Sequence, residues 1–367
     1  MSRRCACCVT ASFESAPRSG RLLSVAAGPS QDERPTLEDV AAYAGVSRST
    51  ASRALNDDAY VSSRSREVVL AAAAALGYSP NQAARSLVTK RTGAVALVLS
   101  EPESKVLDDP YFAAIMHGAF RELTAAGMQM LLMFVDTRDD VPRTIRFLEG
   151  GHVDGALVVA PHKGDPLPTA LRLLRLPVVF GGRPGTISRG IHTVDFDNQG
   201  GARMAVEHLL GIGRTRIATV TGPLDHPAAR DRLTGWEDAL VAAGLRIEAM
   251  SESGDFTLEG GERAMRCLLH RAPDLDAVFA ASDPMAAGAM RALIAAGRQI
   301  PQDVAVVGFD DHPTLAPAMN PPLTSIHQDP REQIGNMVRT LIALLAGDPV
   351  RPGTKILPVS IARRGSA

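Results

Sequence analysis

The chain has 367 residues, of which 45% are hydrophobic, and its 39 lysine and arginine residues nearly balance 40 acidic residues. A chain of this length can bury a sizeable core and form two or three domains. The balanced charge excludes a strong long-range attraction of the whole chain to nucleic acid. Because no stretch of the sequence approaches the length of an apolar membrane span, we expect no transmembrane helix.

Residues 1–34 predict a disordered N-terminal extension, because they are rich in Cys, Ser, Gly and Pro and lack the apolar stretch of a signal peptide. Cys5, Cys7 and Cys8 have no histidine or further cysteine at ligand spacing, so we expect neither a metal nor a cofactor. The cysteine usage suits a reducing cytoplasm, where we expect the protein to be located. A start codon placed too far upstream would also explain this extension.

Residues 36–55 predict two short helices joined by a tight turn. Thr36 is a good N-cap, and Asp39 can return the hydrogen bond as in a capping box. Gly45 can adopt the positive φ that ends a helix, and Ser47 can cap the next one. Such a unit presents its second helix to the major groove of DNA. An ordinary amphipathic helix pair in a protein core is the alternative that these features leave open.

The second helix should begin at Arg48 and expose one side to DNA. Arg48, Ser49 and Arg53 then face the base edges, while Ala51 and Ala54 pack behind them. A third helix follows, capped by Ser62 or Ser63, and Gly77 closes it after Leu76. The segment therefore predicts a three-helix headpiece.

Several motifs in this region occur in a fixed order. They are Asp-Val-Ala-x-x-Ala-Gly-Val-Ser from residue 39, Ser-Arg-x-Leu-Asn from 52, Leu-Gly-Tyr-x-Pro-Asn from 76 and Ala-Arg-Ser-Leu from 84. Together they resemble the DNA-binding headpiece and hinge of the lactose-repressor (LacI/GalR) family of bacterial transcription regulators. The resemblance continues from Thr36 to the end of the chain.

The resemblance implies that residues 80–88 form a hinge helix when two subunits sit on an operator, and that Leu87 wedges into the minor groove. Leu87 as a leucine of a small satellite core is the alternative. Val88 stands where many relatives have a basic or polar residue, and Ala51 replaces a usual valine. The residues that the family pattern assigns to DNA are Thr36, Ser47, Arg48, Ser49, Thr50, Arg53, Asn56, Tyr78, Asn81, Ala84 and Leu87.

Residues 35–91 are only mildly basic, with seven lysine and arginine residues against five acidic ones, a net charge of +2. Contacts to phosphates set nonspecific affinity for DNA, so a single headpiece should bind weakly. Useful affinity for an operator then requires two headpieces on adjacent half-sites. We therefore expect a homodimer on double-stranded operator DNA, without deciding between a dimer and a higher oligomer.

From Gly93 onward, apolar runs of strand length alternate with amphipathic segments, which predicts a doubly wound parallel α/β domain. The fold class is thus α/β, with a helix-turn-helix headpiece and hinge before two lobes that resemble periplasmic sugar-binding proteins. The predicted strands are 94–99, 129–135, 153–159, 177–180, 216–220, 277–280 and 304–309.

The predicted domain boundaries follow from these segments. The headpiece spans 35–79, the hinge helix and linker 80–92, and the effector-binding and dimerisation domain 93–367. The break near residues 195–201 divides that domain into two lobes, and Pro321, Pro322 and residues 324–329 should carry the chain back between them. One lobe should combine 93–194 with 325–338, and the other 195–324 with 339–367.

Ligands of such sheets bind beyond the carboxyl ends of the strands, where this sequence has polar and aromatic residues. Carrying over the family's pocket, we expect Arg232 and Asp310 as polar clamps and Phe196 and Phe256 as apolar walls around a sugar or related molecule. The secondary contacts should be Ser100, Ser282 and Gln328.

Each assignment has a plainer alternative. Arg232 could be a surface ion-pair partner, Asp310 a helix cap, and either phenylalanine an ordinary core residue. Two positions depart from the lactose-type pattern: Gly182 replaces a common aspartate, and Ala160 offers no polar side chain. The identity of the effector therefore cannot be transferred from the family.

A catalytic function is not expected, because the sequence has no His-Glu-x-x-His, no Gly-x-Ser-x-Gly and no phosphate-binding loop. We expect a sequence-specific transcriptional regulator, a repressor in the simplest reading, whose operator affinity a small molecule controls. A soluble sugar-binding protein without a regulatory DNA role is the alternative. The sequence does not tell inducer from co-repressor, nor which operator is read.

Overall fold

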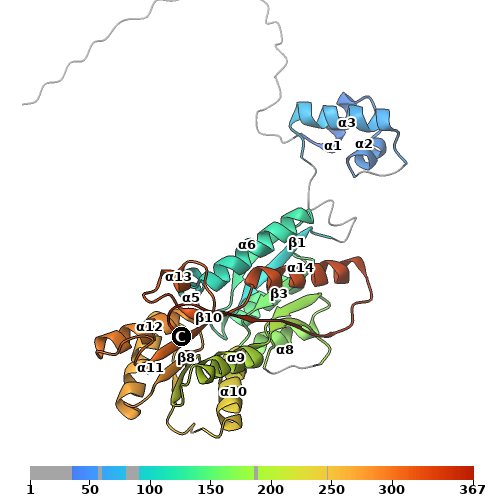
Figure 1. The fold of residues 1–367 in the computed structure, drawn as a ribbon. Helices are drawn as coiled ribbons and strands as arrows, with labels where there is room; N and C mark the ends of the chain where they lie inside the picture. Colours follow the sequence, from blue (N-terminus) through green and yellow to red (C-terminus); the bar gives the residue numbers. More distant parts are fainter. Residues whose placement is uncertain (1–34, 57–59, 80–90, 186–188, 246) are drawn as a thin grey trace, which may run out of the picture. The chain divides into compact units, whose positions relative to one another are not determined.

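A computed structural model describes residues 35–56, 60–79, 91–185, 189–245 and 247–367. The chain divides into two compact units, residues 1–84 and 85–367 (Figure 1). The described residues of each unit form a hydrophobic core of their own.

The first unit contains α1 (Leu37–Tyr43), α2 (Arg48–Leu55) and α3 (Ser63–Leu76). The Thr36 hydroxyl accepts a hydrogen bond from the Asp39 amide, and the Asp39 carboxylate accepts one from the Thr36 amide, which completes the predicted capping box.

The turn between α1 and α2 is a Schellman turn. Gly45 has φ of 66°, and the amide of Val46 donates to the carbonyl of Ala41 at 3.0 Å. Ser47 then caps α2 by accepting from the Thr50 amide at 3.1 Å. These local bonds fix the angle at which the second helix leaves the first.

Small residues allow the three helices to pack closely. Val40 and Val69 are fully buried, and alanines fill most of the remaining core of the headpiece. Ala51, which stands where a valine is usual, is also fully buried. The buried residues of this core are Val40, Ala41, Ala51, Ala54, Val69, Ala72 and Ala73.

The first lobe of the second unit is built on a six-stranded sheet whose strand pairs are all parallel. Alternate residues of β1 (Ala94–Leu99) face opposite sides of the sheet. Val95 and Leu97 pack under α6 (Pro110–Ala125) and α14 (Pro330–Ala346). Ala96 and Val98 pack under α7 (Asp140–Glu149) and α8 (Pro166–Leu173). In sheet order the strands are β11 (Gly353–Leu357), β5 (His192–Phe196), β4 (Val178–Gly181), β3 (Gly155–Val159), β1 (Ala94–Leu99) and β2 (Gln129–Phe134). The helices are α5 (Glu103–Asp108), α6 (Pro110–Ala125), α7 (Asp140–Glu149), α8 (Pro166–Leu173) and α14 (Pro330–Ala346).

The second lobe repeats this architecture around Trp236, Phe279 and Phe309, which are all buried. Its six-stranded sheet is parallel except for the antiparallel pair of β10 and β12. In sheet order the strands are β12 (Ser360–Ala362), β10 (Thr324–His327), β9 (Ala305–Asp310), β8 (Ala277–Ala280), β6 (Ile217–Thr221) and β7 (Ser251–Ser253). The helices are α9 (Asn198–Gly211), α10 (Pro227–Ala242), α11 (Leu258–Arg271), α12 (Asp283–Ala295) and α13 (Leu315–Ala318).

The predicted division into lobes is wrong in its second half. β10 at 324–327 lies in the second sheet, whereas α14 and β11, expected partly or wholly in the second lobe, belong to the first. The chain therefore crosses between lobes at Asp197, at 328–329 and at 358–359. Of the predicted return segment, Pro321 and Pro322 precede β10 and residues 324–327 form it, so only residues 328–329 make the crossing.

The strands absent from the prediction share one property. β5, β7, β10, β11 and β12 contain polar residues or lie at sheet edges, so none reads as an apolar run. Thr324 and Ser325 of β10 are nevertheless fully buried, because neighbouring groups accept and donate their hydrogen bonds.

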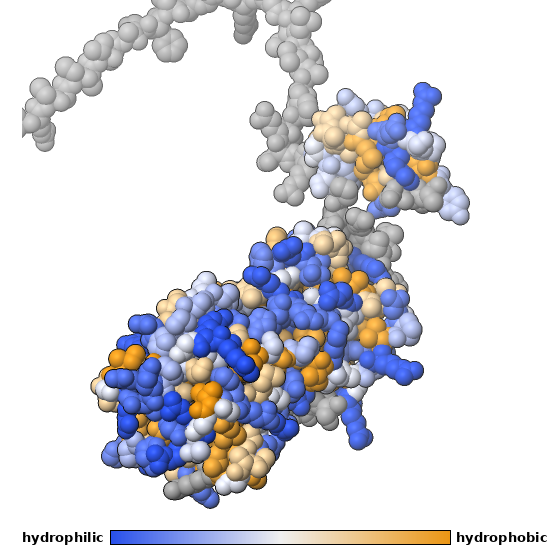
Figure 2. Space-filling model, in the orientation of Figure 1, coloured by the Kyte–Doolittle hydropathy of each residue, from blue (hydrophilic) through white to orange (hydrophobic). Residues whose placement is uncertain are grey.

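On the face drawn in Figure 2, hydrophobic residues are scattered among hydrophilic ones. Among the described residues, no helix has the length and apolar character needed to span a membrane.

The contact between α11 and α12 depends on glycine. A Cβ atom added at Gly288 would overlap the carbonyl oxygen of Leu258, which is rigid backbone. We expect Gly288→Ala to lower the free energy of unfolding by about 2 kcal/mol or more, measured by urea denaturation. Gly211→Ala is the matched control: its Cβ would meet no atom within 4 Å, so stability should hold or rise. Equal stability of the two variants would contradict this packing.

Candidate functional site: a cleft between two lobes and an exposed recognition helix

A cavity lies between the lobes, where the carboxyl ends of strands from both sheets meet. Ala160 follows β3, Gly182 follows β4, Asn198 follows β5, and Ser282 follows β8. The edge is the one at which parallel α/β sheets bind their ligands. Both departures from the lactose-type pattern, Ala160 and Gly182, therefore lie in the cavity wall.

Arg232 is the charged centre of this cavity. It extends from α10 and is only 5% exposed. Its Nε donates to Asn198 Oδ1 at 2.9 Å and its Nη1 to the carbonyl of Ala281 at 2.6 Å, while the guanidinium lies 3.6 Å from the centroid of the Phe309 ring. A buried charge without such partners would be costly, so these contacts hold the guanidinium in place.

Asp310 and Gln328 complete the clamp. Asp310 Oδ1 lies 3.5 Å from Arg232 Nη1 and accepts from Gln328 Nε2 at 2.8 Å. Burial raises the pKa of the Asp310 carboxyl, and the nearby Arg232 guanidinium opposes that shift. Arg232, Asp310 and Gln328 thus offer donors and acceptors that can bind the hydroxyl groups of a sugar. The alternative readings of Arg232 as a surface ion-pair partner and of Asp310 as a cap do not describe this geometry.

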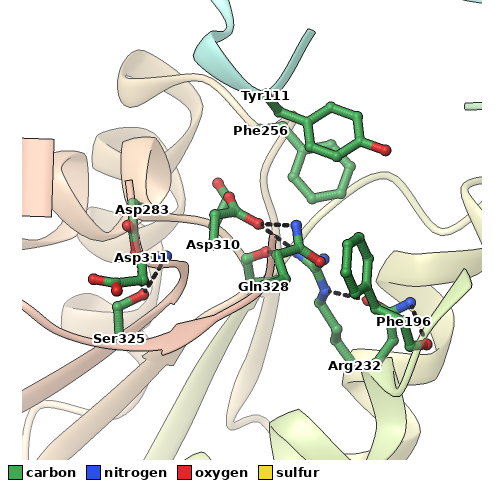
Figure 3. A network of polar contacts seen from close by, with 12 residues as sticks. Tyr111, Phe196, Arg232, Phe256, Asp283, Asp310, Asp311, Ser325 and Gln328 are labelled. Atoms are coloured by element: carbon green, nitrogen blue, oxygen red, sulfur yellow. Dashed lines mark hydrogen bonds and ion pairs between the residues drawn. The ribbon is translucent and has the colours of Figure 1, made fainter. Parts of the chain in front are cut away.

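Aromatic side chains form the apolar walls. Figure 3 shows the rings of Tyr111, Phe196 and Phe256 around the clamp of Arg232, Asp310 and Gln328. Tyr111 comes from α6 of the first lobe, and its hydroxyl donates to Gln333 Oε1 at 2.7 Å. Flat apolar rings next to hydrogen-bonding groups match the two faces of a sugar ring.

The two serines differ in position. Ser282 lines the cavity, but its hydroxyl accepts from the Met285 amide and caps α12. Ser100 does not line the cavity: it is buried at the end of β1 and faces an adjoining outer cavity. The following residue, Glu101, lines both this outer cavity and the inner one.

Sequence reasoning missed several polar residues that line the cavity. Asp109 and Tyr111 lie at the start of α6, where the sequence assigns them no role, and His226 gives no signal because it is an isolated histidine. Nδ1 of His226 is buried and has no hydrogen-bond partner among the described residues, and burial lowers the pKa of this ring to about 3. The missed residues are Glu101, Lys105, Asp109, Tyr111, Asp195, Asn198, His226 and Gln333.

Strained backbone is concentrated at the cleft. Ala160, Phe256, Asp310 and Asp311 all have positive φ, between 51° and 104°, although none is glycine. Such conformations persist only where the surrounding structure holds them, and three of these residues line the cavity. The sequence gives no sign of them, because the strain comes from tertiary contacts.

Asp283 lies behind Asp310 and is fully buried at the start of α12. Its carboxylate accepts from the Ser325 hydroxyl and from the His312 amide, both at 2.6 Å, and so fixes the loop that follows Asp310 (Figure 3). Desolvation raises the pKa of Asp283 to about 7.

In the headpiece, α2 presents a polar surface. Arg48, Ser49, Arg53 and Asn56 are exposed, whereas Ala51 and Ala54 are buried on the opposite side of the helix. Arg48 Nε lies 2.6 Å from the Glu38 carboxylate of α1, and both side chains are more than half exposed. The guanidinium of Arg48 is therefore accessible to a partner that displaces Glu38.

Other residues expected at the DNA have local structural roles as well. The hydroxyls of Thr36 and Ser47 cap helices, and Thr50 shares the cap of Ser47 at 2.8 Å. Tyr78 packs partly against the headpiece core. Asn81, Ala84 and Leu87 lie outside the described residues, so their assignment to DNA stays a prediction.

A helix-turn-helix unit in one chain with a two-lobed domain that encloses a cavity defines the class of ligand-responsive DNA-binding proteins. Residues 36–81 match the bacterial regulatory proteins of the lacI family, and residues 206–367 match a periplasmic binding protein-like domain. The chain is 46% identical over 336 residues to the HTH-type transcriptional regulator CelR of Thermobifida fusca, covering 91% of this chain and 98% of that protein. This chain therefore belongs to the lacI family of bacterial regulatory proteins, as its motifs predict.

Further relatives match this chain over almost all of their own length. The ribose operon repressor of Escherichia coli (strain K12) is 35% identical, covering 90% of this chain and 99% of the repressor. A CelR–cellobiose complex matches with a TM-score of 0.73 at 43% identity, covering 91% of this chain and all of that one. A lac repressor dimer bound to operator and the anti-inducer ONPF matches with a TM-score of 0.81 at 30% identity, covering 91% and 99%.

The buried carboxyl of Asp283 predicts a pH dependence of stability. Because its pKa is raised to about 7 in the folded state, its contribution to stability is present at acidic pH and is lost as the pH rises through 7. Asp283→Asn cannot ionise and keeps an acceptor for the His312 amide. We compare the free energies of unfolding of the variant and of the natural protein by urea denaturation. The difference between them should change in favour of the variant by up to about 4 kcal/mol as the pH rises from 4 to 8. A constant difference across this range would show that Asp283 is ionised throughout.

Proposed function

We propose that this protein is a sequence-specific transcriptional repressor, and that a short sugar bound between its lobes controls its affinity for operator DNA. The observation that carries the proposal is the buried clamp of Arg232, Asp310 and Gln328 beside aromatic walls, in a chain that also has a helix-turn-helix headpiece. Cellobiose, the sugar in the CelR complex, is the first effector to test.

The cavity supports a neutral, hydroxyl-rich ligand. The guanidinium of Arg232 already donates to Asn198 and Ala281 and faces the Asp310 carboxyl, so it is not free to pair with a charged ligand. Arg232, Asp310, Gln328 and the neutral ring of His226 can instead exchange hydrogen bonds with hydroxyl groups. Tyr111, Phe196 and Phe256 cover the apolar faces of the rings.

The DNA-binding role is supported by the exposed face of α2 and by the lac repressor dimer on its operator. Since one headpiece with a net charge of +2 binds weakly, two subunits would read adjacent half-sites as a homodimer. Thr36, Tyr78 and residues 80–88 would then position the headpieces, with Leu87 of each chain in the minor groove.

Control of operator affinity follows from the two lobes. A ligand changes the equilibrium between lobe arrangements only by its difference in affinity for them. A coupling free energy of about 3 kcal/mol would suffice for a roughly 100-fold change in operator affinity.

The protein then acts by binding and has no catalytic step, and its site of action is the cytoplasm. The alternative of a sugar-binding protein without a DNA role leaves the headpiece and the exposed polar face of α2 unexplained.

The first test removes the clamp. Arg232→Met keeps an unbranched stem over the Phe309 ring but loses every donor of the guanidinium. We expect unchanged operator binding and at least a 100-fold weaker response to cellobiose, measured by fluorescence anisotropy with labelled operator. The control is Arg172→Ala, an exposed arginine of α8, which should respond normally. A normal response of Arg232→Met would contradict the clamp.

The second test concerns sequence reading by α2. Because Arg48 and Ser49 are exposed at the start of α2, exchanging these two residues should change which operator sequence is preferred. The measurement is selection of bound duplexes from a random library followed by sequencing. Arg64→Ala, an exposed arginine of α3, should leave the preference unchanged. If both variants select the natural sequence, Arg48 and Ser49 do not read bases.

A further inference from the structure

One rim of the interlobe cleft is closed by a cluster centred on His162, which the clamp does not involve. His162 lies in the loop after β3 of the first lobe, and Asp225 lies in the loop after β6 of the second. His162 Nδ1 is 3.0 Å from Asp225 Oδ2, and His162 Nε2 is 3.2 Å from Glu101 Oε1. We call Glu101, His162 and Asp225 the outer gate.

The charges of the outer gate favour a stable contact between the lobes. Each ring nitrogen of His162 faces a carboxylate, and a histidine can donate from both nitrogens only when it is protonated. The two carboxylates raise the pKa of His162, while Lys105 also contacts Glu101 at 2.6 Å. Only 4% of the Glu101 side chain is exposed, so part of this bridge is protected from solvent screening.

A backbone contact accompanies the side chains. The amide of Lys163 donates to the carbonyl of Asp225 at 2.7 Å, which joins the two lobes beside the gate. The ring centroids of His162 and His226 lie 5.3 Å apart with the rings nearly perpendicular, and His226 makes a similar contact with Phe256. The gate is therefore continuous with the wall of the effector cavity.

The outer gate lies beside two cavities that share Glu101 and Lys105 as lining residues. The inner one, with the clamp, has a volume of about 90 Å³, and the outer one has about 510 Å³. Glu101 and Lys105 line both, whereas His162 and Asp225 line only the outer cavity. A ligand that extends from the clamp past Glu101 must displace His162 from its carboxylate partners. Ser100 Oγ, buried and without a hydrogen-bond partner among the described residues, lines the outer cavity.

We propose that the outer gate determines the length of the effector, admitting one or two sugar rings and rejecting longer chains, an inference that rests on the proposed sugar effector. A longer oligosaccharide breaks the bridge that His162 forms between the lobes, and so it cannot stabilise their closed arrangement. Removal of His162 opens the inner cavity into the outer one, where further rings find room.

The first experiment measures binding of cellobiose and cellotetraose by calorimetry. We expect the natural protein to bind cellobiose at least about tenfold more tightly than cellotetraose. In His162→Ala this preference should fall to about threefold or less, because the tetrasaccharide can enter the outer cavity. His270→Ala, an exposed histidine of α11, should keep the natural preference. An unchanged preference in His162→Ala, or equal binding of both sugars by the natural protein, would overturn the gate.

The second experiment needs no sugar. Hydrogen exchange of the Lys163 amide, followed by mass spectrometry, reports the contact between the lobes beside the gate. His162→Ala should accelerate this exchange by about tenfold or more, the effect of losing charge-assisted hydrogen bonds. His162→Gln and Asp225→Asn, which disturb packing less, should each accelerate it to a smaller extent.

The two experiments separate the gate from the proposed effector. If neither sugar binds the natural protein while exchange is faster in His162→Ala, the cello-oligosaccharide effector is wrong and the gate between the lobes stands. Unchanged exchange of Lys163 in His162→Ala and His162→Gln overturns the gate whatever sugar binds.

Discussion

The structure of the cleft depends on one buried cation. The guanidinium of Arg232 is almost removed from water, so its hydrogen bonds must be met by protein groups. Asn198 after β5, Ala281 after β8 and Gln328 after β10 supply them, and the carboxyl of Asp310, the last residue of β9, faces the guanidinium. The polar contacts of this one side chain therefore hold the ends of four strands in place. A ligand that binds there meets groups that are already oriented.

The same region contains the crossings between the lobes. Two of the partners of Arg232 lie where the chain passes from one sheet to the other. Asn198 follows the crossing at Asp197, and Gln328 lies in the crossing at 328–329. The amide of Asp197 also donates to the carbonyl of Leu357, next to the third crossing at 358–359. A ligand that alters the contacts of Arg232 therefore acts directly on the segments about which the lobes can move. At the outer gate, the contact between His162 and Asp225 limits how far the lobes separate.

Much of the site follows from sequence because its residues lie directly after apolar strands. Ser282 and Asp310 follow or end such strands, and the family pattern adds Phe196, Arg232, Phe256 and Gln328. Ser100 also follows an apolar strand, but it lines only the outer cavity, whereas the next residue, Glu101, lines both cavities. Tyr111, His226 and Gln333 come from helices and loops far apart in the chain, and no local pattern brings them together. Their roles depend on how the two sheets are placed, which no single segment encodes.

The sequence by itself determined the local elements: the capping box at Thr36, the turn at Gly45, the end of α3 at Gly77, and the buried strands from β1 to β9 that read as apolar runs. Each depends on backbone preferences or on hydrophobic periodicity within a few residues. Tertiary structure alone decided that α14 and β11 return to the first lobe, that polar Thr324 and Ser325 are buried, and that Asp310 adopts positive φ. These features arise from contacts between distant segments, whose free energies outweigh the local preferences of the residues involved.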